Sequence, residues 1–231
     1  MAITAAATCA NSIAAMSRET RPEAALRAWA IDATANAQLA AREQILAGGK
    51  GDHAMLRALA ERSLARSPTN GVAARVLGFV AAQEGDLPAA FGAMRFAHAL
   101  TRRDLATELW LIEYHVQRDD VPRVLKHFDA AASTSQQAMG TLFPILITAV
   151  EDDRLVMPIA DTLKRDPWWS QSLLRGMADQ STAPDNVWRL FAELSRSGIA
   201  IQGETLGVLR RRYPKVKSPS GLKVVAPSAL P

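Results

Sequence analysis

A turn followed by a proline and an apolar stripe recurs in this chain at a fixed spacing. The stretch EGDLPAAFGAMRFAHAL begins at Glu84, and RDDVPRVLKHFDAAAST begins at the equivalent position, Arg118. Gly and Asp are typical of the point where one helix stops and the next starts. The same register aligns a set of turn residues: Gly51-Asp52, Gly85-Asp86, Asp119-Asp120 and, more weakly, Asp153. A fixed period of about 34 residues indicates helix–turn–helix units that stack on one another.

Apolar residues keep the same register behind each turn. Pro88 and Pro122 fall in the first helical turn, where the missing N–H has no helical partner. Three further columns are spaced four and then three residues apart, which places them on one helical face. These columns are Leu56, Ala90, Val124; Ala60, Met94, Phe128; and Ser63, Ala97, Ala131. The helix before each turn carries a fourth column, Leu77, Leu111 and Ile145. We expect these residues to be buried between stacked helices.

The composition favours an all-α fold. Hydrophobic residues make up 48% of the chain, alanine is abundant, and no segment shows a convincing strand alternation. Alanine is the strongest helix former, and its small side chain lets helices approach closely. We predict a helix from Pro22 to Leu46 with a break near Asp32. We also expect Asp185 to cap a later helix, which ends at Gly198.

The unit NGVAARVLGFVAAQEGDLPAAFGAMRFAHAL resembles the tetratricopeptide repeat. Leu77-Gly78 stand where the family has its Leu-Gly pair, and Ala90 and Ala97 stand where it keeps small residues. The resemblance implies a right-handed solenoid of helical hairpins. The sequence departs from the family at Ala74 and Glu108, which replace a bulky aromatic, and at His115, where the family has an apolar or aromatic residue. In the fourth unit, we expect the first helix to start near Leu142 or to kink at Pro144.

These observations divide the chain into segments. We expect a weakly ordered segment over 1–21, then about three to four tetratricopeptide-like hairpins over 22–167. Divergent helices over 168–213 would cap the array, as solenoid ends require. A Pro/Ser-rich flexible tail would follow over 214–231.

No motif of a known enzyme class is visible. The chain has no phosphate-binding Gly-rich loop, no G-x-S-x-G and no H-E-x-x-H, and its four histidines do not pair at helical metal-site spacings. The densest polar cluster, Glu113, His115, Asp119 and Asp120, is typical of a solvated turn. Of Trp168 and Trp169, we expect one in the core and one at a rim. Cys9, the single cysteine, has no basic context. We predict a non-enzymatic chain without catalytic residues, metal or cofactor.

The resemblance implies a function in protein binding. Stacked hairpins would form a concave groove lined by the first helix of each unit, suited to a peptide or helix of a partner protein. The expected partner-binding residues are Arg75, Phe79, Leu109, Glu113 and Ile147. The alternative is that Leu109 and Ile147 only pack between hairpins. We expect an adaptor in a bacterial multiprotein assembly, with no small-molecule substrate, and the sequence leaves the oligomeric state open.

A basic segment near the C-terminus supports a second hypothesis. Its cations could bind a nucleic acid or an anionic surface, with Tyr213 stacking on a base. They could equally form a solvated helix end that complements the helix dipole. The residues are Arg210, Arg211, Arg212, Lys215 and Lys217. The chain shows no convincing signal peptide and no apolar stretch of membrane-spanning length. We therefore expect a cytoplasmic protein, with association with the cell envelope left open.

Overall fold

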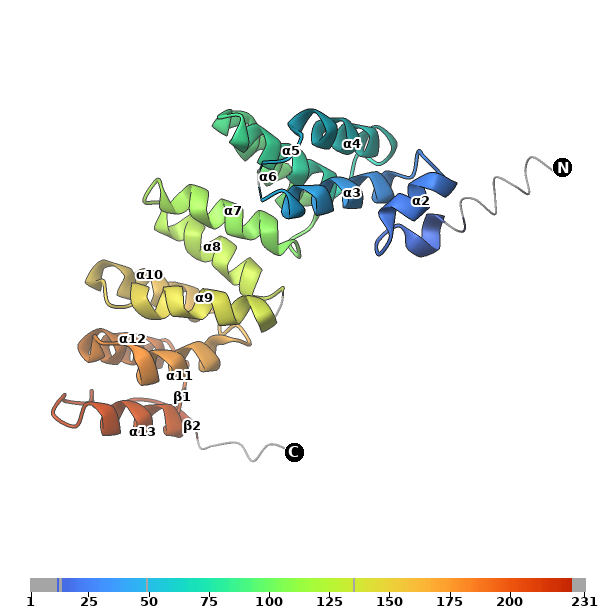
Figure 1. Cartoon of the computed structure of the whole chain (residues 1–231). Helices are drawn as coiled ribbons and strands as arrows, with labels where there is room; N and C mark the ends of the chain where they lie inside the picture. The colour runs from blue at the N-terminus through green and yellow to red at the C-terminus, as the bar shows by residue number, and fades with distance from the viewer. Residues whose placement is uncertain (1–11, 13, 49, 135, 226–231) are drawn as a thin grey trace. The chain divides into compact units, whose positions relative to one another are not determined.

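The computed structural model describes residues 12, 14–48, 50–134 and 136–225. Helices dominate this part of the chain and confirm the all-α class, and the strands described are two residues long (Figure 1). The chain divides into two compact units, an N-terminal unit (Met1–Leu111) and a C-terminal unit (Ile112–Pro231). Cys9 lies outside the described residues. None of the described helices combines the length and hydropathy needed to cross a bilayer.

Helices adjacent in sequence pack against each other in the N-terminal unit. They are α2 (Pro22–Ala28), α3 (Ala33–Leu46), α4 (His53–Arg66), α5 (Gly71–Gln83), α6 (Leu87–Leu100) and the first part of α7 (Leu105–Val116). Helix α3 contacts both α4 and α5, while α5 also contacts α6. Small side chains bring these helices together, because the core includes Ala37, Ala40, Ala41, Ala60 and Ala73.

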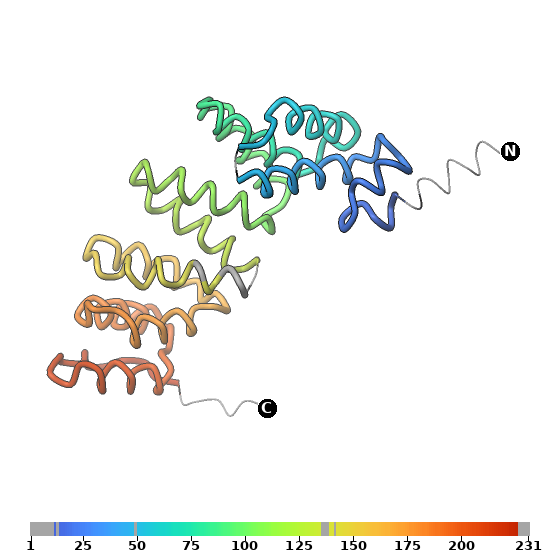
Figure 2. The backbone as a smooth tube through the Cα atoms, in the orientation of Figure 1, coloured from blue at the N-terminus to red at the C-terminus, as the bar shows by residue number. Residues whose placement is uncertain are grey.

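The C-terminal unit arranges its helices in two rows. Its elements after α7 are α8 (Val121–Ala132), α9 (Gln136–Ala149), α10 (Asp153–Leu163), α11 (Ser170–Gln180), α12 (Pro184–Arg196), β1 (Ile201–Gln202), α13 (Gly203–Arg212) and β2 (Val224–Val225). Helix α11 contacts α9 and α13, and α10 contacts α8 and α12. Figure 2 shows the backbone path through this unit, coloured from green to red. Each hairpin is therefore packed against the next within this unit.

The predicted turn aspartates cap the helices that follow them. The side chains of Asp52, Asp86 and Asp120 accept hydrogen bonds from the backbone N–H three residues ahead, at 3.0, 3.0 and 3.3 Å. Each bond satisfies a donor that the helix itself leaves without a partner. The fourth turn departs from the register of the first three, because the capping residue is Asp152, whereas we expected Asp153. Successive caps at Asp52, Asp86 and Asp120 are 34 residues apart, whereas Asp152 follows Asp120 by 32, so the repeat is two residues shorter at this point.

The predicted columns lie in the core, except in the fourth unit. Most members of the first three columns are buried, and Val124 is half-buried: Leu56, Ala60, Ser63, Ala90, Met94, Ala97, Phe128 and Ala131 are the buried ones. In the fourth column Leu111 is buried and Leu77 is half-buried, but Ile145 is 55% exposed, so the predicted burial of Ile145 is wrong. Leu142 and Leu146 are buried on α9 in its place. Helix α9 begins at Gln136, earlier than the expected start near Leu142, and contains Pro144.

Several local predictions can be compared directly with the helix ends. The expected break near Asp32 is present, because Asp32 caps α3 and accepts from the Ala35 N–H at 2.8 Å. Trp169 is fully buried and Trp168 is 59% exposed, as predicted for a core and a rim residue. Asp185 is not the N-cap of α12, because that position is occupied by Ala183 and Asp185 lies in the first turn. The helix starts earlier than expected because Pro184 suits its first position.

The C-terminal segment returns to the helical array. Strand β2 pairs in parallel with β1, with Ile201 opposite Val224 and Gln202 opposite Val225. The Ile201 N–H donates to the Lys223 carbonyl at 2.8 Å, and the Lys223 N–H donates to Ser195 Oγ at 3.2 Å. We expected a flexible tail from residue 214, and no sequence pattern indicated this pairing. Helix α13 therefore lies in the segment that connects the two paired strands.

Candidate functional site

Arg75, the cation expected in the groove, is buried. It lines a cavity of about 240 Å³ beside α2 and α3, and its Nε lies 2.8 Å from Asp104 Oδ2. The ion pair joins α5 to the residue just before α7. Because the guanidinium is already paired with a carboxylate and shielded from solvent, Arg75 is not a free groove cation. The expectation that it contacts a partner directly is therefore not supported by its position.

The other four predicted groove residues differ in exposure. Phe79 is half-buried and Leu109 is 38% exposed, both in the N-terminal unit. Glu113 is exposed in the C-terminal unit, where its Oε1 accepts a hydrogen bond from Gln117 Nε2 at 2.8 Å. Leu109 and Glu113 are the members of the set that solvent reaches most readily.

Ile147 packs between two hairpins. It is buried and lines a groove of about 450 Å³ between α9 and α11. A Cβ added to Gly176 would lie 2.9 Å from Ile147 Cδ1, so the two helices approach closely there. The interpretation that Ile147 is a packing residue therefore fits better than its role as an exposed groove residue. Pro144 lines the same groove and lacks an N–H, which leaves the Gly140 carbonyl without its helical donor.

The sequence did not indicate a second apolar feature of the C-terminal unit. It is a pocket of about 340 Å³, which we call the α7–α10 pocket because α7, α8, α9 and α10 all contribute to its walls. The apolar lining residues are Ile112, Val116, Val121, Val124, Leu125, Phe128, Leu142, Ile145, Leu146, Ala149, Leu155 and Ile159. Its walls come from two successive hairpins of the repeat.

The pocket opens to solvent at the fourth repeat, where the repeat leaves its regular spacing. Val116 and Ile145 line it and are 53% and 55% exposed, whereas Phe128 and Leu142 line it from the buried interior. If α9 kept the register of the earlier hairpins, Ile145 would occupy the buried column of Leu111. An apolar surface that is both concave and solvent-accessible is uncommon on a soluble unit and is typical of binding sites.

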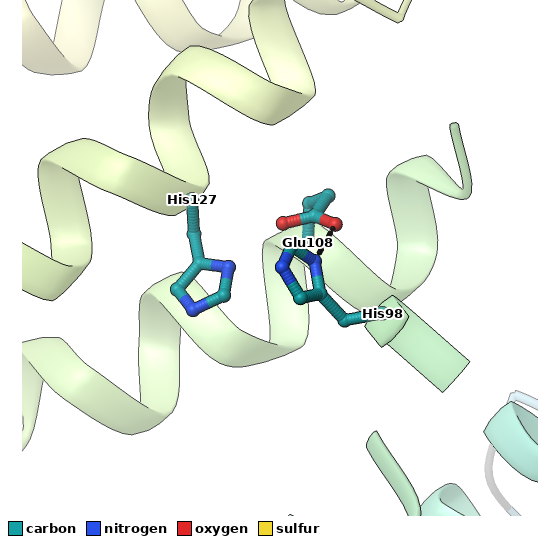
Figure 3. A group of neighbouring side chains, drawn as sticks. All are labelled: His98, Glu108 and His127. Atoms are coloured by element: carbon teal, nitrogen blue, oxygen red, sulfur yellow. Dashed lines mark hydrogen bonds and ion pairs between the residues drawn. The ribbon is translucent and has the colours of Figure 1, made fainter. Parts of the chain in front are cut away.

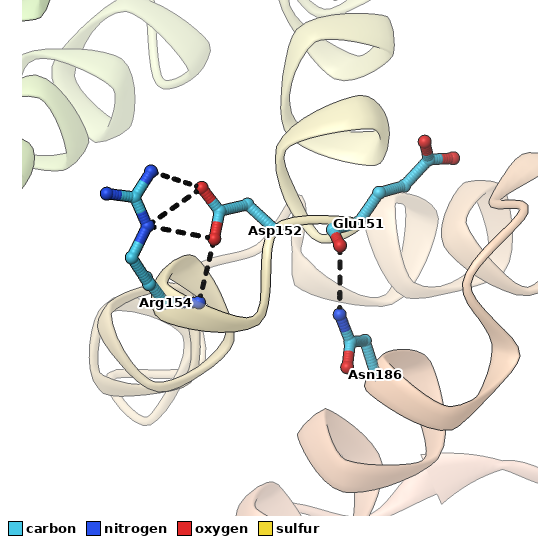
Figure 4. Close-up of polar contacts among 4 residues, drawn as sticks. All are labelled: Glu151, Asp152, Arg154 and Asn186. Carbon is cyan, nitrogen blue, oxygen red and sulfur yellow. Dashed lines mark hydrogen bonds and ion pairs between the residues drawn. The ribbon is translucent and has the colours of Figure 1, made fainter.

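Charged side chains surround the apolar walls. Asp119, Asp120, Asp152 and Arg154 complete the lining. Asp152 and Arg154 form an ion pair with Arg154 Nη2 at 2.7 Å from Asp152 Oδ2 (Figure 4). Hydrogen bonds from the Arg154 side chain and backbone lower the pKa of Asp152. The three carboxylates of the lining, set against Arg154 and against Arg123 just outside the lining, leave the rim slightly acidic.

The second aspartate cap at this rim is also held ionised. Asp120 pairs with the side chain of Arg123 and caps α8. Partial burial raises the pKa of Asp120, but the hydrogen bonds from the backbone and side chain of Arg123, together with its charge, lower that pKa overall. Both capping aspartates therefore remain negatively charged near neutral pH.

The turn that carries Asp152 is fixed to the following hairpin. Asn186 Nδ2 donates to the carbonyls of Val150 and Glu151, each at 3.1 Å, and the second bond is drawn in Figure 4. The backbone N–H and hydroxyl of Thr182 donate to Glu151 Oε1 at 2.9 and 2.7 Å, and these bonds lower the pKa of Glu151. The α9–α10 turn is thus held by side chains from the α11–α12 hairpin.

Histidines lie beneath the α7–α8 turn. His115 is buried, and its ring stacks on that of His127 with the centroids 5.5 Å apart. His115 Nδ1 lies 3.6 Å from Asp120 Oδ2. Burial and the charge of His127 lower the pKa of His115, and Asp120 opposes this shift only in part. Of the polar cluster expected from the sequence, His115 is therefore an interior residue, while Glu113 and Asp119 are exposed.

A second buried polar pair lies in the N-terminal unit. His98 Nδ1 is 2.6 Å from Glu108 Oε1, and Glu108 is fully buried (Figure 3). Glu108 is one of the residues at which the sequence departs from the tetratricopeptide pattern, and a hydrogen-bonded pair occupies this position. Within the described part of either unit taken alone, no three His, Cys, Asp or Glu side chains meet at metal-ligand distances.

The α7–α10 pocket has the chemistry of a binding site. Its described lining offers apolar surface, three aspartates and one arginine, and none of these residues forms a nucleophile–base pair. Neither a scan of protein-family models nor a search of curated proteins finds a match to this chain. The pocket is therefore interpreted from its own geometry.

Proposed function

We propose that this chain is a non-enzymatic protein-interaction module of the tetratricopeptide type. In this proposal the α7–α10 pocket receives an apolar side chain from a segment of a partner protein. The observation that carries the proposal is an open, apolar pocket of about 340 Å³ built by four helices. This volume lies at the lower end of the roughly 300–1,000 Å³ typical of ligand sites. It suits an anchoring side chain or two better than a large cofactor.

The charge of the rim defines the partner more closely. Asp119, Asp120 and Asp152 outnumber Arg154 around the apolar walls. A segment with a Lys or Arg next to its apolar anchor would complement this rim, and such charges mainly improve specificity and association rate. We therefore propose a short helix or extended segment with one apolar anchor and a flanking cation.

The energy of binding would come mainly from the anchor. Val116 and Ile145 each leave about half of their surface in water in the free protein. Covering them and burying a partner's Leu, Ile or Phe removes apolar surface on both sides, and full burial of such a side chain is worth about 1.5–3 kcal/mol. Residues of this kind at the centre of an interface often cost about 2 kcal/mol or more when truncated.

The repeat architecture supports this assignment. The aspartate caps at Asp52, Asp86 and Asp120 recur at one fixed spacing, and the columns behind them are buried. These features fit a right-handed solenoid, which commonly serves as a binding scaffold, and an adaptor role in a bacterial assembly. Leu109 and Glu113 remain accessible to a partner, whereas Arg75 and Ile147 support the structure from within.

The test uses peptides of known sequence. A displayed random-peptide library is selected on the full chain, and individual synthetic peptides are then measured by fluorescence anisotropy. We expect selected peptides to share an apolar residue flanked by Lys or Arg. Ile145→Glu should weaken their binding by at least about 30-fold, which corresponds to about 2 kcal/mol.

A matched control separates the pocket from general surface effects. Met157 is 41% exposed on α10 and does not line the pocket. Met157→Glu should keep peptide affinity within twofold of the unmodified chain, and circular dichroism should show both variants folded. Equal affinity of Ile145→Glu and the unmodified chain, or failure to select any peptide, would contradict the proposal.

A further inference from the structure

The charge of this chain is distributed unevenly. Residues 205–231 contain six Lys or Arg and no Asp or Glu. The whole chain has a net charge of +4, so residues 1–204 carry a net charge of −2. A basic segment attached to a slightly acidic body is typical of proteins that contact polyanions. This feature plays no part in the α7–α10 pocket.

The first part of the basic segment is held by the fold. Tyr213 Oη donates to the Ser181 carbonyl at 2.9 Å, and Arg212 Nη2 donates to the Gln180 carbonyl at 3.2 Å. The Val216 N–H donates to the Tyr213 carbonyl at 3.2 Å. These bonds fasten the end of α13 and the following turn to the end of α11. Its cations are therefore presented from an ordered surface.

The strand pairing fixes a further cation. Lys223 precedes β2, and its backbone bonds to both Ile201 and Ser195. The chain between α13 and β2 is consequently tied down at both ends. We name the cations of this region the basic cluster: Arg210, Arg211, Arg212, Lys215, Lys217 and Lys223.

The basic cluster differs from several exposed cations of the same unit that are paired with carboxylates. Arg154, Arg189 and Arg196 each pair with a carboxylate, on Asp152, Asp153 and Glu193. All six side chains of the basic cluster are exposed, and among the described residues none of them has a carboxylate within 4 Å. The positive charge is therefore left uncompensated by the protein.

We infer that the basic cluster binds the phosphodiester backbone of a nucleic acid. Three successive arginines offer planar donor groups that match phosphate oxygens. Insertion into a membrane surface would instead use an exposed apolar face beside the cations. Leu206 and Leu209 of α13 are buried, and the exposed large apolar residues of this region are Val224 and Val225 in β2. The chemistry therefore favours phosphate contacts in water over insertion into lipid.

The test measures salt-dependent binding to a defined probe. The full chain is titrated against a short fluorescein-labelled oligouridylate between about 50 and 200 mM salt, a range over which phosphate contacts weaken strongly. Six contacts at about 0.7 each predict a slope near −4 for log K against log salt. Arg210→Gln/Arg211→Gln/Arg212→Gln should weaken binding at the lowest salt at least tenfold. For this triple variant, the slope of log K against log salt should become shallower, at about −2.

Matched variants make the outcome specific to the basic cluster. Arg62, Arg66 and Arg95 are exposed in the N-terminal unit, and their replacement by Gln changes the net charge equally. That control should retain binding within twofold. Lys215→Gln/Lys217→Gln, which leaves α13 intact, should lower affinity and reduce the slope by about 1.4.

Three results would overturn the inference. One is equal loss in the control variant, which would assign binding to the overall charge. Another is a salt slope near zero, which would exclude phosphate neutralisation as the source of affinity. The third is retention of the chain by phosphatidylserine vesicles without binding of the oligonucleotide, which would assign the cluster to membranes.

Discussion

Replacing Ala97 with arginine tests the phase of the repeat at its most closely packed column. Ala97 is fully buried on α6, as are Ser63 and Ala131 at the equivalent positions of the preceding and following repeats. A Cβ added to Gly71 would lie 3.1 Å from Thr101 Cγ2 and 3.7 Å from the Ala97 carbonyl oxygen, so the start of α5 closely approaches the end of α6. Overpacking such a site costs about 1–3 kcal/mol. Burial of an unpaired guanidinium adds to this cost, so we expect a loss of about 3 kcal/mol or more.

Ala99 provides the matched control. It lies on the same helix but is exposed, and Ala99→Arg should change stability by no more than about 0.5 kcal/mol. Glu84, a turn residue, is less suitable because it pairs with Arg57 at 2.5 Å and lies 4.0 Å from His53. Losing that surface pair would itself cost about 0.2–1 kcal/mol.

Urea unfolding followed by circular dichroism measures the effect. With an m-value of about 1–3 kcal/mol/M, the loss corresponds to a midpoint lowered by about 1–3 M. Hydrogen exchange should show reduced protection in α5 and α6, which pack against each other. If Ala97→Arg is as harmless as Ala99→Arg, or if both are equally damaging, the assigned helical face is wrong.

Two further predictions concern a cap and a buried imidazole. Asp86→Ala should cost about 1 kcal/mol in urea unfolding, because the Ala89 N–H loses its acceptor, and Asp86→Asn should restore most of it. The C-terminal unit should lose stability as the pH falls below about 6.5, the ordinary pKa of histidine. Burial and His127 lower the pKa of His115 in the folded state, so the unfolded chain takes up the proton first. Midpoints measured by tryptophan fluorescence should fall on acidification from there, and His115→Gln should flatten the decline; a flat profile in the unmodified chain would contradict this.

Local and periodic signals accounted for most of the correct predictions. An aspartate at a helix start bonds to an N–H only three residues away, so Asp52, Asp86 and Asp120 could be assigned from the sequence alone. The buried face of α6 followed from spacing within one helix. Such features depend on few residues and little on the rest of the chain.

Long-range pairing accounted for most of what was missed. Arg75 meets Asp104 far along the chain, and neither residue carries a local signal of that contact. The strands at Ile201 and Val224 are too short for an alternation to be recognised. The α7–α10 pocket lies where the fourth repeat leaves the period: Asp152 caps α10 and Ile145 is exposed, and no local signal in the sequence indicated either.

The regular spacing of the aspartate caps has a consequence for how such a chain can evolve. Each of the first three hairpins contains its own stop, start and buried face, repeated at the same spacing. Duplication or deletion of one such hairpin would preserve the packing interfaces between its neighbours, so the number of repeats can change without changes to the remaining residues. The turn at Asp152 breaks this interchangeability, because a repeat duplicated across this turn would inherit its two-residue offset. Selection acting on the pocket beside that joint would therefore preserve the irregular repeat while the regular ones remain free to multiply.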